Sequence, residues 1–312
     1  MLNSFLTIGE QIFIVFLLMA VGYIGGKTGL ITNALADGMS LLVMNIAIPA
    51  SIIMAFQREF ESRLVHEFLL SIVLALLGYV LFLTVAFLTI RDKDKKRRNT
   101  LIFTAVFANC AMVALPLQSS LFGADGVFCG AVAVAMFDLI FWPLGTLMMI
   151  PGEKPKKGEL LKKCIVNPCV IANLVALAMF FGRITIPSVP AQALDKLGSL
   201  CLPLCMLVLG QKLTRRPLAE LFTDRGSLLA AAERLVIFPL LIIAVMKLLH
   251  IGGTAAMSAL IAMASPSAAS VVMIAVAYKQ DSELAASSVA LSTVLSLLTM
   301  PPVIFLGSIL LL

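Results

Sequence analysis

Charged residues are scarce in this 312-residue sequence. Asp, Glu, Lys and Arg make up 13% of the chain and hydrophobic residues 61%, whereas soluble chains carry about 25% charged and about 45–50% apolar residues. The apolar segments are about 20 residues long or longer, which is enough to cross about 30 Å of hydrocarbon as helices, and alternating strands of about ten residues are missing. The composition therefore excludes a soluble globular protein and predicts an all-α integral membrane protein.

Clusters of metal ligands and paired cysteines are missing as well. The two histidines, His66 and His250, fall at the ends of apolar segments, and the six cysteines form no CxxC pair. The cysteines lie in or beside apolar segments: Cys110, Cys129, Cys164, Cys169, Cys201 and Cys205. Because free cysteine behaves as a small apolar residue, we predict no metal site, no disulfide framework and no cofactor.

Nucleotide-binding motifs and soluble domains are also missing. The longest loops have about ten residues and no GxxxxGK[ST] pattern occurs. We therefore predict that the chain is not an enzyme and does not pump with ATP by itself. The net charge of +6 is spread over short loops, so it predicts no nucleic-acid partner.

Apolar runs separated by charged or Pro/Gly-rich breaks predict ten membrane spans. They cover residues 8–30, 36–56, 67–90, 100–122, 127–150, 161–182, 192–213, 227–250, 255–278 and 284–311. Most of the 23 Lys and Arg residues lie in loops that follow odd-numbered spans. By the positive-inside rule these loops are cytoplasmic and both termini are extracytoplasmic. The loop RDKDKKRR (91–98) is alternatively a binding surface for anionic membrane lipid.

Interior prolines recur at corresponding places in the two halves of the chain. Pro116 in span four corresponds to Pro266 in span nine, and Pro143 in span five corresponds to Pro301 in span ten. Each half, 1–150 and 151–312, then holds five spans. Because five is an odd number, the second half enters the membrane from the opposite side, so the sequence predicts a 5+5 inverted repeat.

Paired prolines in repeat-related spans predict interrupted helices in spans four and nine that cross near the midplane and form a substrate site. Proline has no N–H, so Pro116 is expected to free the carbonyl of Met112, and Pro266 that of Ala262. The N-termini of the half-helices carry partial positive charge, which favours an anion. Alternatively, each proline only kinks its helix and serine side chains bond the freed carbonyls.

Three amide side chains near the predicted breaks are candidate substrate ligands. Asn109 lies just before the break in span four, where its amide can donate to a carboxylate or satisfy freed carbonyls. Asn45 lies about one turn before a proline in span two, where it contacts substrate or forms an interhelical hydrogen bond. Gln118 follows Pro116 by two residues.

Charged residues inside the spans need a specific reason. An ionised side chain at the position of Asp138, near the centre of span five, costs about 2.5–3.5 kcal/mol. Asp138 is therefore either a coupling site for a proton or sodium ion or a protonated carboxyl bonded to a neighbouring helix. Glu233 and Arg234 are about 100° apart around a helix and do not face each other, and we expect Arg234 to extend toward the cytoplasmic surface.

Four stretches resemble the auxin efflux carrier family, especially its bacterial, malate-permease-like members. They are GYIGGKTGL (22–30), NIAIPASIIMAF (45–56), ANCAMVALPLQSSLFG (108–123) and ASPSAASVVMIAVAYKQDSELAASSVALSTVLSLLTMPPV (264–303). The resemblance implies a ten-helix inverted repeat in which spans 1, 2, 6 and 7 form a scaffold, expected to be a homodimer. Spans 3–5 and 8–10 would form a moving transport domain in which spans four and nine cross.

The same resemblance implies a site at the two crossovers. It places Asn109, Cys110 and Pro116 at one of them, and the second set comprises Ser265, Pro266 and Ser267. Family members often carry Thr-Gly after the asparagine, where this chain has Cys-Ala, and residues 68–90 of span three include no Asp, Glu, His, Lys or Arg. These departures leave auxin itself in doubt as a substrate.

The combined expectation is a multi-pass protein of the bacterial inner (plasma) membrane that transports a small organic anion. We expect a secondary active or potential-driven carrier of a carboxylate that works by alternating access, with a proton or sodium ion as the possible coupling partner. The alternative is a membrane sensor or channel that binds an anion at the crossover without carrier turnover.

Overall fold

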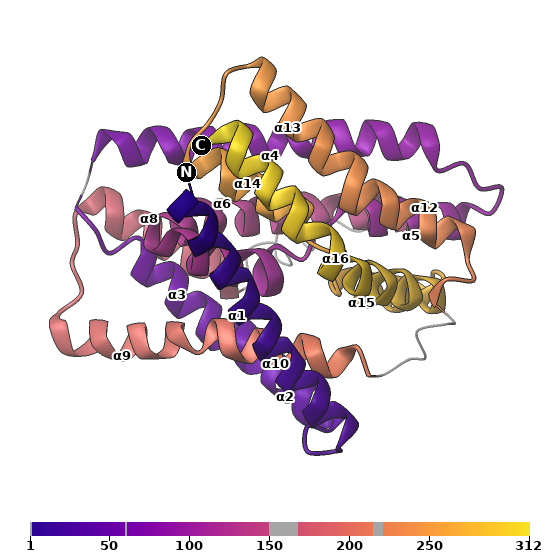
Figure 1. Ribbon diagram of the computed structural model, residues 1–312, viewed down its shortest axis with the longest axis horizontal. Helices are drawn as coiled ribbons and strands as arrows, with labels where there is room; N and C mark the ends of the chain where they lie inside the picture. The colour runs from indigo at the N-terminus through magenta and orange to yellow at the C-terminus, as the bar shows by residue number, and fades with distance from the viewer. Residues whose placement is uncertain (1, 60, 150–167, 215–220) are drawn as a thin grey trace.

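The computed structural model describes residues 2–59, 61–149, 168–214 and 221–312 (Figure 1). Within these ranges the regular structure is helical, with one isolated β-bridge, so the all-α prediction is confirmed. The elements, with η for a π-helical turn, are α1 (Leu2–Lys27), α2 (Asn33–Leu42), η1 (Val43–Ala47), α3 (Ile48–Ala55), α4 (Ser62–Thr89), α5 (Lys95–Val106), η2 (Cys110–Ala114), α6 (Leu115–Met149), α8 (Pro168–Gly182), α9 (Ser188–Ser199), α10 (Cys201–Lys212), α12 (Arg225–Ala232), η3 (Glu233–Ile237), α13 (Phe238–Leu248), α14 (Thr254–Ala264), α15 (Ser270–Ala277) and α16 (Ser282–Leu311).

Several helical stretches in the described part of the chain suit a bilayer. Six are long and apolar enough to cross it: Asn33–Ala55, Ser62–Thr89, Cys110–Met149, Ser188–Lys212, Arg225–Leu248 and Ser282–Leu311. Three shorter apolar helices are Phe13–Lys27, Pro168–Gly182 and Thr254–Ala264. Each of the ten predicted spans contains helix, although residues 161–167 of span six lie outside the described residues. The prediction of a multi-pass membrane protein is confirmed.

The long stretch Cys110–Met149 consists of two helices that fold back on each other at Gly123. Gly123 has φ 56° and ψ −136°, a conformation that glycine adopts readily because it has no Cβ. Beyond this residue, Gly126 packs against the backbone of Gln118 and Gly130 against its side chain. In a continuous helix these residues would lie about two turns or more from Gln118. The predicted boundary between spans four and five therefore coincides with a real turn.

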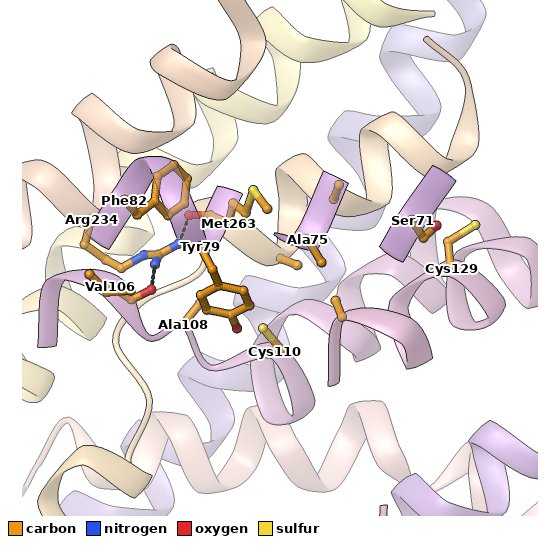
Figure 2. Close-up of a pocket in the computed structure, with 13 residues that line it drawn as sticks. Ser71, Ala75, Tyr79, Phe82, Val106, Ala108, Cys110, Cys129, Arg234 and Met263 are labelled. Carbon is orange, nitrogen blue, oxygen red and sulfur yellow. Dashed lines mark hydrogen bonds between the residues drawn. The ribbon is translucent and has the colours of Figure 1, made fainter. Parts of the chain in front are cut away.

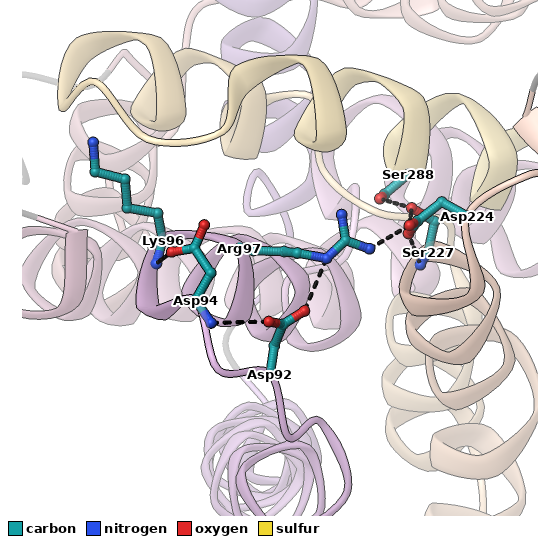
Figure 3. A network of polar contacts seen from close by, with 7 residues as sticks. All are labelled: Asp92, Asp94, Lys96, Arg97, Asp224, Ser227 and Ser288. Carbon is teal, nitrogen blue, oxygen red and sulfur yellow. Dashed lines mark hydrogen bonds and ion pairs between the residues drawn. The ribbon is translucent and has the colours of Figure 1, made fainter.

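Basic loops from distant parts of the sequence meet at one end of the molecule. Arg97 at the start of α5 forms an ion pair with Asp224, which precedes α12 (Figure 3). Lys96 Nζ donates to the carbonyl of Lys279, between α15 and α16, at 3.3 Å. The N-terminal ends of α5 and α12 and the α15–α16 turn lie together at the right of Figure 1.

Three other loops, those that follow predicted spans two, four and six, meet elsewhere. Arg58, after α3, pairs with Asp125, which lies just beyond the Gly123 turn, and Arg58 Nη1 is 2.5 Å from Asp125 Oδ1. Gln57 Oε1 accepts from the N–H of Ile186 at 2.8 Å, which connects this loop to the segment between α8 and α9. The loop that follows predicted span two therefore contacts the loops that follow spans four and six.

Small residues let helices of the two halves approach closely. The helix α1 packs along α10, with Gly22 against the backbone of Leu207 and Gly210 against that of Met19. A Cβ atom at either glycine would overlap main-chain atoms of the other helix. Close backbone approach of this kind is typical of helix pairs in membranes, where packing replaces the hydrophobic driving force.

Candidate functional site

Two helical segments are interrupted and the interruptions pair with each other. The helix α5 ends at Val106 and η2 begins at Cys110, while α14 ends at Ala264 and α15 begins at Ser270. An isolated antiparallel bridge joins Ala108 to Ser267. Around it, Asn109 N donates to the Pro266 carbonyl at 2.7 Å and Ala268 N donates to the Phe107 carbonyl at 2.9 Å. The sequence predicted interruptions in these two spans, and the structure brings them together. We call this region, residues 107–109 and 265–269, the crossover.

The sequence predicted the first interruption at Pro116, but the structure places it earlier, between Val106 and Cys110. Pro116 follows the π-helical turn η2 and is the second residue of α6, so the chain is helical on both sides of it. In this turn the Asn109 carbonyl accepts from both Val113 N and Ala114 N, at 3.2 Å each. Proline is tolerated near a helix start, where N–H groups lack intrahelical partners. The residue that marks this break is Asn109, whose side chain caps the turn.

All carbonyl groups at the end of α5 are paired despite the interruption. A helix leaves its last four carbonyls without partners inside the helix. Each of these four accepts a hydrogen bond: Phe103 from Phe107 N (3.0 Å), Thr104 from Ser267 Oγ (2.7 Å), and Ala105 and Val106 from Arg234 Nη1 (3.3 and 2.6 Å). The crossover therefore tolerates an apolar environment because side chains supply the missing donors.

Arg234 was expected to reach the cytoplasmic surface, and the structure corrects this. Its side chain is 1% exposed and lies at the crossover, where Nη1 contacts the α5 carbonyls and Nη2 donates to the carbonyl of Met263 in α14 (Figure 2). The guanidinium also lies over the rings of Phe82 and Phe238, 5.5 and 6.0 Å from their centroids. Counting residues from the span end placed Arg234 near the surface, but its face of the helix directs it inward.

The two serines of the second interruption bond to main-chain carbonyls. Ser265 Oγ donates to the carbonyl of Ile261 at 2.8 Å, and Ser267 Oγ donates to that of Thr104 at 2.7 Å. Both serines are buried, with at most 1% exposure. Their hydroxyls therefore stabilise the crossover, and neither of them bonds the Ala262 carbonyl that Pro266 was expected to free.

A cavity of about 330 Å³ lies beside the crossover and collects four of the predicted site residues. These are Asn45, Asn109, Cys110 and Asp138. Asn109 Oδ1 accepts from Met112 N at 3.2 Å, whereas its Nδ2 group has no hydrogen-bond partner among the described residues. Asn45 Nδ2 donates to the Leu41 carbonyl at 2.7 Å. A volume of this size suits a small-molecule site.

A second cavity of about 410 Å³ adjoins the first and shares Asn109, Met112, Lys212, Ala269 and Met273 with it. Lys212 ends α10 and lines both cavities, and the second cavity is also lined by a carboxylate residue, Asp37. Lys212 was not singled out from the sequence, where it falls near the end of predicted span seven (192–213). The only signal was its position at the end of a predicted scaffold span.

Gln118 and Pro116 are not among the residues that line either cavity. Gln118 is fully buried and its Nε2 donates to the carbonyl of Ser258 in α14 at 2.7 Å. The structure therefore separates these two predicted residues from Asn109. Pro266 lines a smaller cavity of about 40 Å³ with residues of α1 and α16.

Asp138 lies in α6 and lines the cavity of about 330 Å³. Its side chain is 6% exposed, and Trp142, one turn later, lines the same cavity. Lys212 lines that cavity from α10, so a carboxylate and a cation from different helices border one space. Within the described residues, no three His, Cys, Asp or Glu side chains gather to hold a metal ion.

A helical membrane protein in which interrupted helices cross beside a cavity lined in part by polar side chains has the architecture of a membrane transporter. The chain belongs to the membrane transport protein family, the auxin efflux carrier-like family, whose model matches residues 7–304. The resemblance inferred from the sequence motifs is therefore confirmed, and the protein is a transporter by family.

Two archaeal relatives are similar over almost their whole length. One is described as an uncharacterized transporter of Methanocaldococcus jannaschii, 28% identical over 302 residues, covering 93% of this chain and 95% of the relative. The other, an uncharacterized transporter of Methanothermobacter thermautotrophicus, is 26% identical over 296 residues, covering 94% and 96%.

Proposed function

We propose that the protein is a secondary transporter that carries a small organic anion, a carboxylate, across the cell membrane by alternating access. The observation that carries the proposal is the crossover, where two interrupted segments are bonded to each other beside a cavity of about 330 Å³. Such paired interruptions are the usual substrate site of transporters built from inverted repeats.

The charge distribution around the cavity favours an anion. The helical segments that begin at Cys110 and Ser270 have their N-termini beside it, and a helix N-terminus carries about half a positive charge. Asn109 Nδ2 is a donor without a partner among the described residues, and Lys212 adds a cation from α10. A carboxylate could accept from both groups.

Helix packing supports a ten-span, 5+5 inverted repeat. The contact of α1 with α10, spans one and seven, has its counterpart in that of α8 with α3, spans six and two. The contact of α4 with α14, spans three and nine, has its counterpart in that of α12 with α5, spans eight and four. Such an exchange of partners is what a two-fold relation between the halves 1–150 and 151–312 requires. Within this proposal, spans 1, 2, 6 and 7 form the scaffold and a homodimer interface.

The distribution of basic residues supports an orientation in which the basic loops are cytoplasmic and both termini extracytoplasmic. The second cavity then reaches toward the cytoplasm, because Asp37 and Lys212 lie near the α1–α2 turn and the end of α10. The opposite side is bridged by the Arg58–Asp125 pair. We therefore propose that this conformation faces inward, with Arg58 and Asp125 separating when the site opens outward.

Asp138 supports a version of the mechanism in which a proton or a sodium ion is coupled to transport. It is the acidic residue of the first cavity, and a buried carboxylate is costly unless it exchanges a proton or binds a cation. In this proposal Asp138 binds the coupling ion while Asn109 and Lys212 bind the anion.

The experiment is transport by purified protein in liposomes. Succinate, malate, 2-oxoglutarate and benzoate are screened first by thermal shift, because a ligand of the native state raises the melting temperature. The best ligand is then followed as radiolabelled flux under proton, sodium and electrical gradients. Saturable flux supports the carrier, binding without flux supports a sensor, and unitary currents support a channel. No binding and no flux for any carboxylate would refute the anion assignment.

Cys110 offers an independent measurement at the same cavity. It lines the cavity, and so does Cys169, whereas the other described cysteines do not. A small thiol reagent that enters the cavity should modify Cys110, and the bound carboxylate should slow this reaction. A Cys169→Ala protein keeps Cys110 as the single thiol that lines the cavity.

A further inference from the structure

Arg234 is a buried cation at the crossover without a carboxylate partner. Its side chain is 1% exposed, and no Asp or Glu within the described ranges forms an ion pair with it. The adjacent Glu233 is directed elsewhere, since its Oε1 lies 2.5 Å from the hydroxyl of Thr89. A buried charge is costly unless surrounding dipoles stabilise it.

The dipoles that stabilise Arg234 are the C-terminal ends of both interrupted helices. Its Nη1 group donates to the carbonyls of Ala105 and Val106 in α5, and Nη2 donates to that of Met263 in α14. Each helix C-terminus is equivalent to about half a negative charge. One guanidinium therefore balances the two carbonyl ends that meet at the crossover.

Because Arg234 neutralises the carbonyl ends, they no longer offset the partial positive charge of the two helix N-termini at the crossover. Cys110 and Ser270, where these helical segments begin, both line the cavity of about 330 Å³. Without a cation, two positive and two negative helix ends would nearly cancel. With Arg234, the crossover carries about one net positive charge, and its amide ends face the cavity.

Arg234 lies close enough for this charge to act on the cavity. Ala108 and Cys110 line both the cavity of about 330 Å³ and a small one of about 20 Å³ that Arg234 also lines (Figure 2). In apolar surroundings, charges interact much more strongly than in water.

We infer that Arg234 is a positioning residue for the anion site, which neutralises the carbonyl ends of the crossing helices and thereby gives the cavity the positive potential that binds a carboxylate. The inference rests on the proposed function and deepens it by assigning the source of the charge. Arginine suits this place because its planar fork can donate to several carbonyls at once, whereas lysine supplies a point charge.

The test compares Arg234→Lys and Arg234→Gln with wild type and with Glu233→Gln. The control changes the adjacent buried residue, which contacts Thr89 and not the crossover carbonyls. Affinity is measured by isothermal titration with whichever of succinate, malate, 2-oxoglutarate and benzoate binds wild type best. We expect R234Q to bind it about tenfold more weakly or worse, R234K within about threefold of wild type, and E233Q unchanged.

Stability is measured on the same samples. Both Arg234 variants should melt at lower temperature because they lose carbonyl donors. If R234K nevertheless binds the carboxylate nearly as tightly as wild type, the positive charge at this position sets the affinity, and the hydrogen bonds of the guanidinium set the stability. A folded R234Q that binds as tightly as wild type overturns the inference. So does a folded R234K that binds as weakly as R234Q, and R234K alone decides if R234Q does not fold. If wild type binds none of the carboxylates, the proposed function fails first and the inference fails with it.

Discussion

The backbone N–H of Asn109 donates to the carbonyl of Pro266 across 2.7 Å, and this bond joins the two halves of the chain. The side chain of the same asparagine bonds to the segment that follows it, because Oδ1 accepts from Met112 N at 3.2 Å. Asn109 therefore fixes the second interruption through its backbone and caps η2 through its side chain. Only its Nδ2 group remains for a solute in the cavity.

Replacing Asn109 with aspartate separates the cap from the donor. Aspartate keeps an oxygen that can cap η2, but it exchanges Nδ2 for a second acceptor with negative charge. We expect N109D to stay folded with little change in melting temperature, while its affinity for a carboxylate falls about tenfold or more. Titration calorimetry and thermal melting measure the two effects on one sample.

The alanine variant provides the comparison. N109A loses the cap as well as the donor, so it should cost about 1 kcal/mol of stability that N109D retains. If N109D bound the carboxylate as well as wild type does, Asn109 would have no role in the anion site.

Removing the Ser267 hydroxyl tests how the crossover is stabilised. In Ser267→Ala the carbonyl of Thr104 loses its donor in a buried site, which costs about 1–3 kcal/mol. Ser308→Ala is the control, because Ser308 is only partly buried and its hydroxyl donates to the Phe305 carbonyl in its own helix. Thermal melting in detergent should show a clear loss for S267A and almost none for S308A. Equal melting temperatures would mean that Thr104 finds another donor.

Part of this site could be predicted from the sequence because a polar residue within an apolar span indicates a binding partner or a cavity. Asn45, Asn109 and Asp138 were singled out as polar groups in apolar helices, and all three line one cavity. The membrane explains this success, since a polar side chain within a span needs a partner or a wet space. The all-α fold followed from the same composition.

Other residues could not be placed because their roles depend on how helices cross. Pro116 marked the correct span but not the break, because a π-helical turn accommodates it. Arg234 and Lys212 lie near predicted span ends, and sequence position alone does not tell which face of the helix they occupy. Their neighbours come from α5, α14 and the crossover, which are distant in the sequence.

Asp138→Asn tests the coupling proposal. Asparagine preserves the size of the side chain but cannot exchange a proton, so a proton-coupled carrier should lose most of its pH dependence. We expect flux driven by a pH gradient to fall about tenfold or more, whereas carboxylate exchange across the membrane without a gradient persists. The measurement is liposome uptake at several external pH values. A pH profile identical to that of wild type would remove Asp138 from the coupling mechanism.

The Arg97–Asp224 pair connects the start of α5 to the start of α12, and its effect on stability should depend on pH (Figure 3). Asp224 Oδ2 also caps α12 by accepting from Ser227 N at 2.7 Å. Partial burial raises the pKa of Asp224, but the hydrogen bonds from Arg97 and Ser227 outweigh burial, so its pKa lies below the ordinary value. The folded state therefore favours the ionised carboxylate.

Two substitutions of Asp224 separate the ion pair from the cap. Asparagine caps a helix about as well as aspartate does, so Asp224→Asn should cost only the pair, about 1 kcal/mol, and Asp224→Ala about 1 kcal/mol more. Because the folded-state pKa is lowered, the contribution of the pair is complete above the unfolded pKa of about 3.9 and disappears as pH falls through the lower folded value. Melting curves of wild type and D224N should therefore differ by a constant amount between pH 5 and 8, which is about one to four units above that value, and approach each other as pH falls below it. A difference that persists undiminished at the acid end would show that the carboxylate charge of Asp224 does not stabilise the contact between α5 and α12.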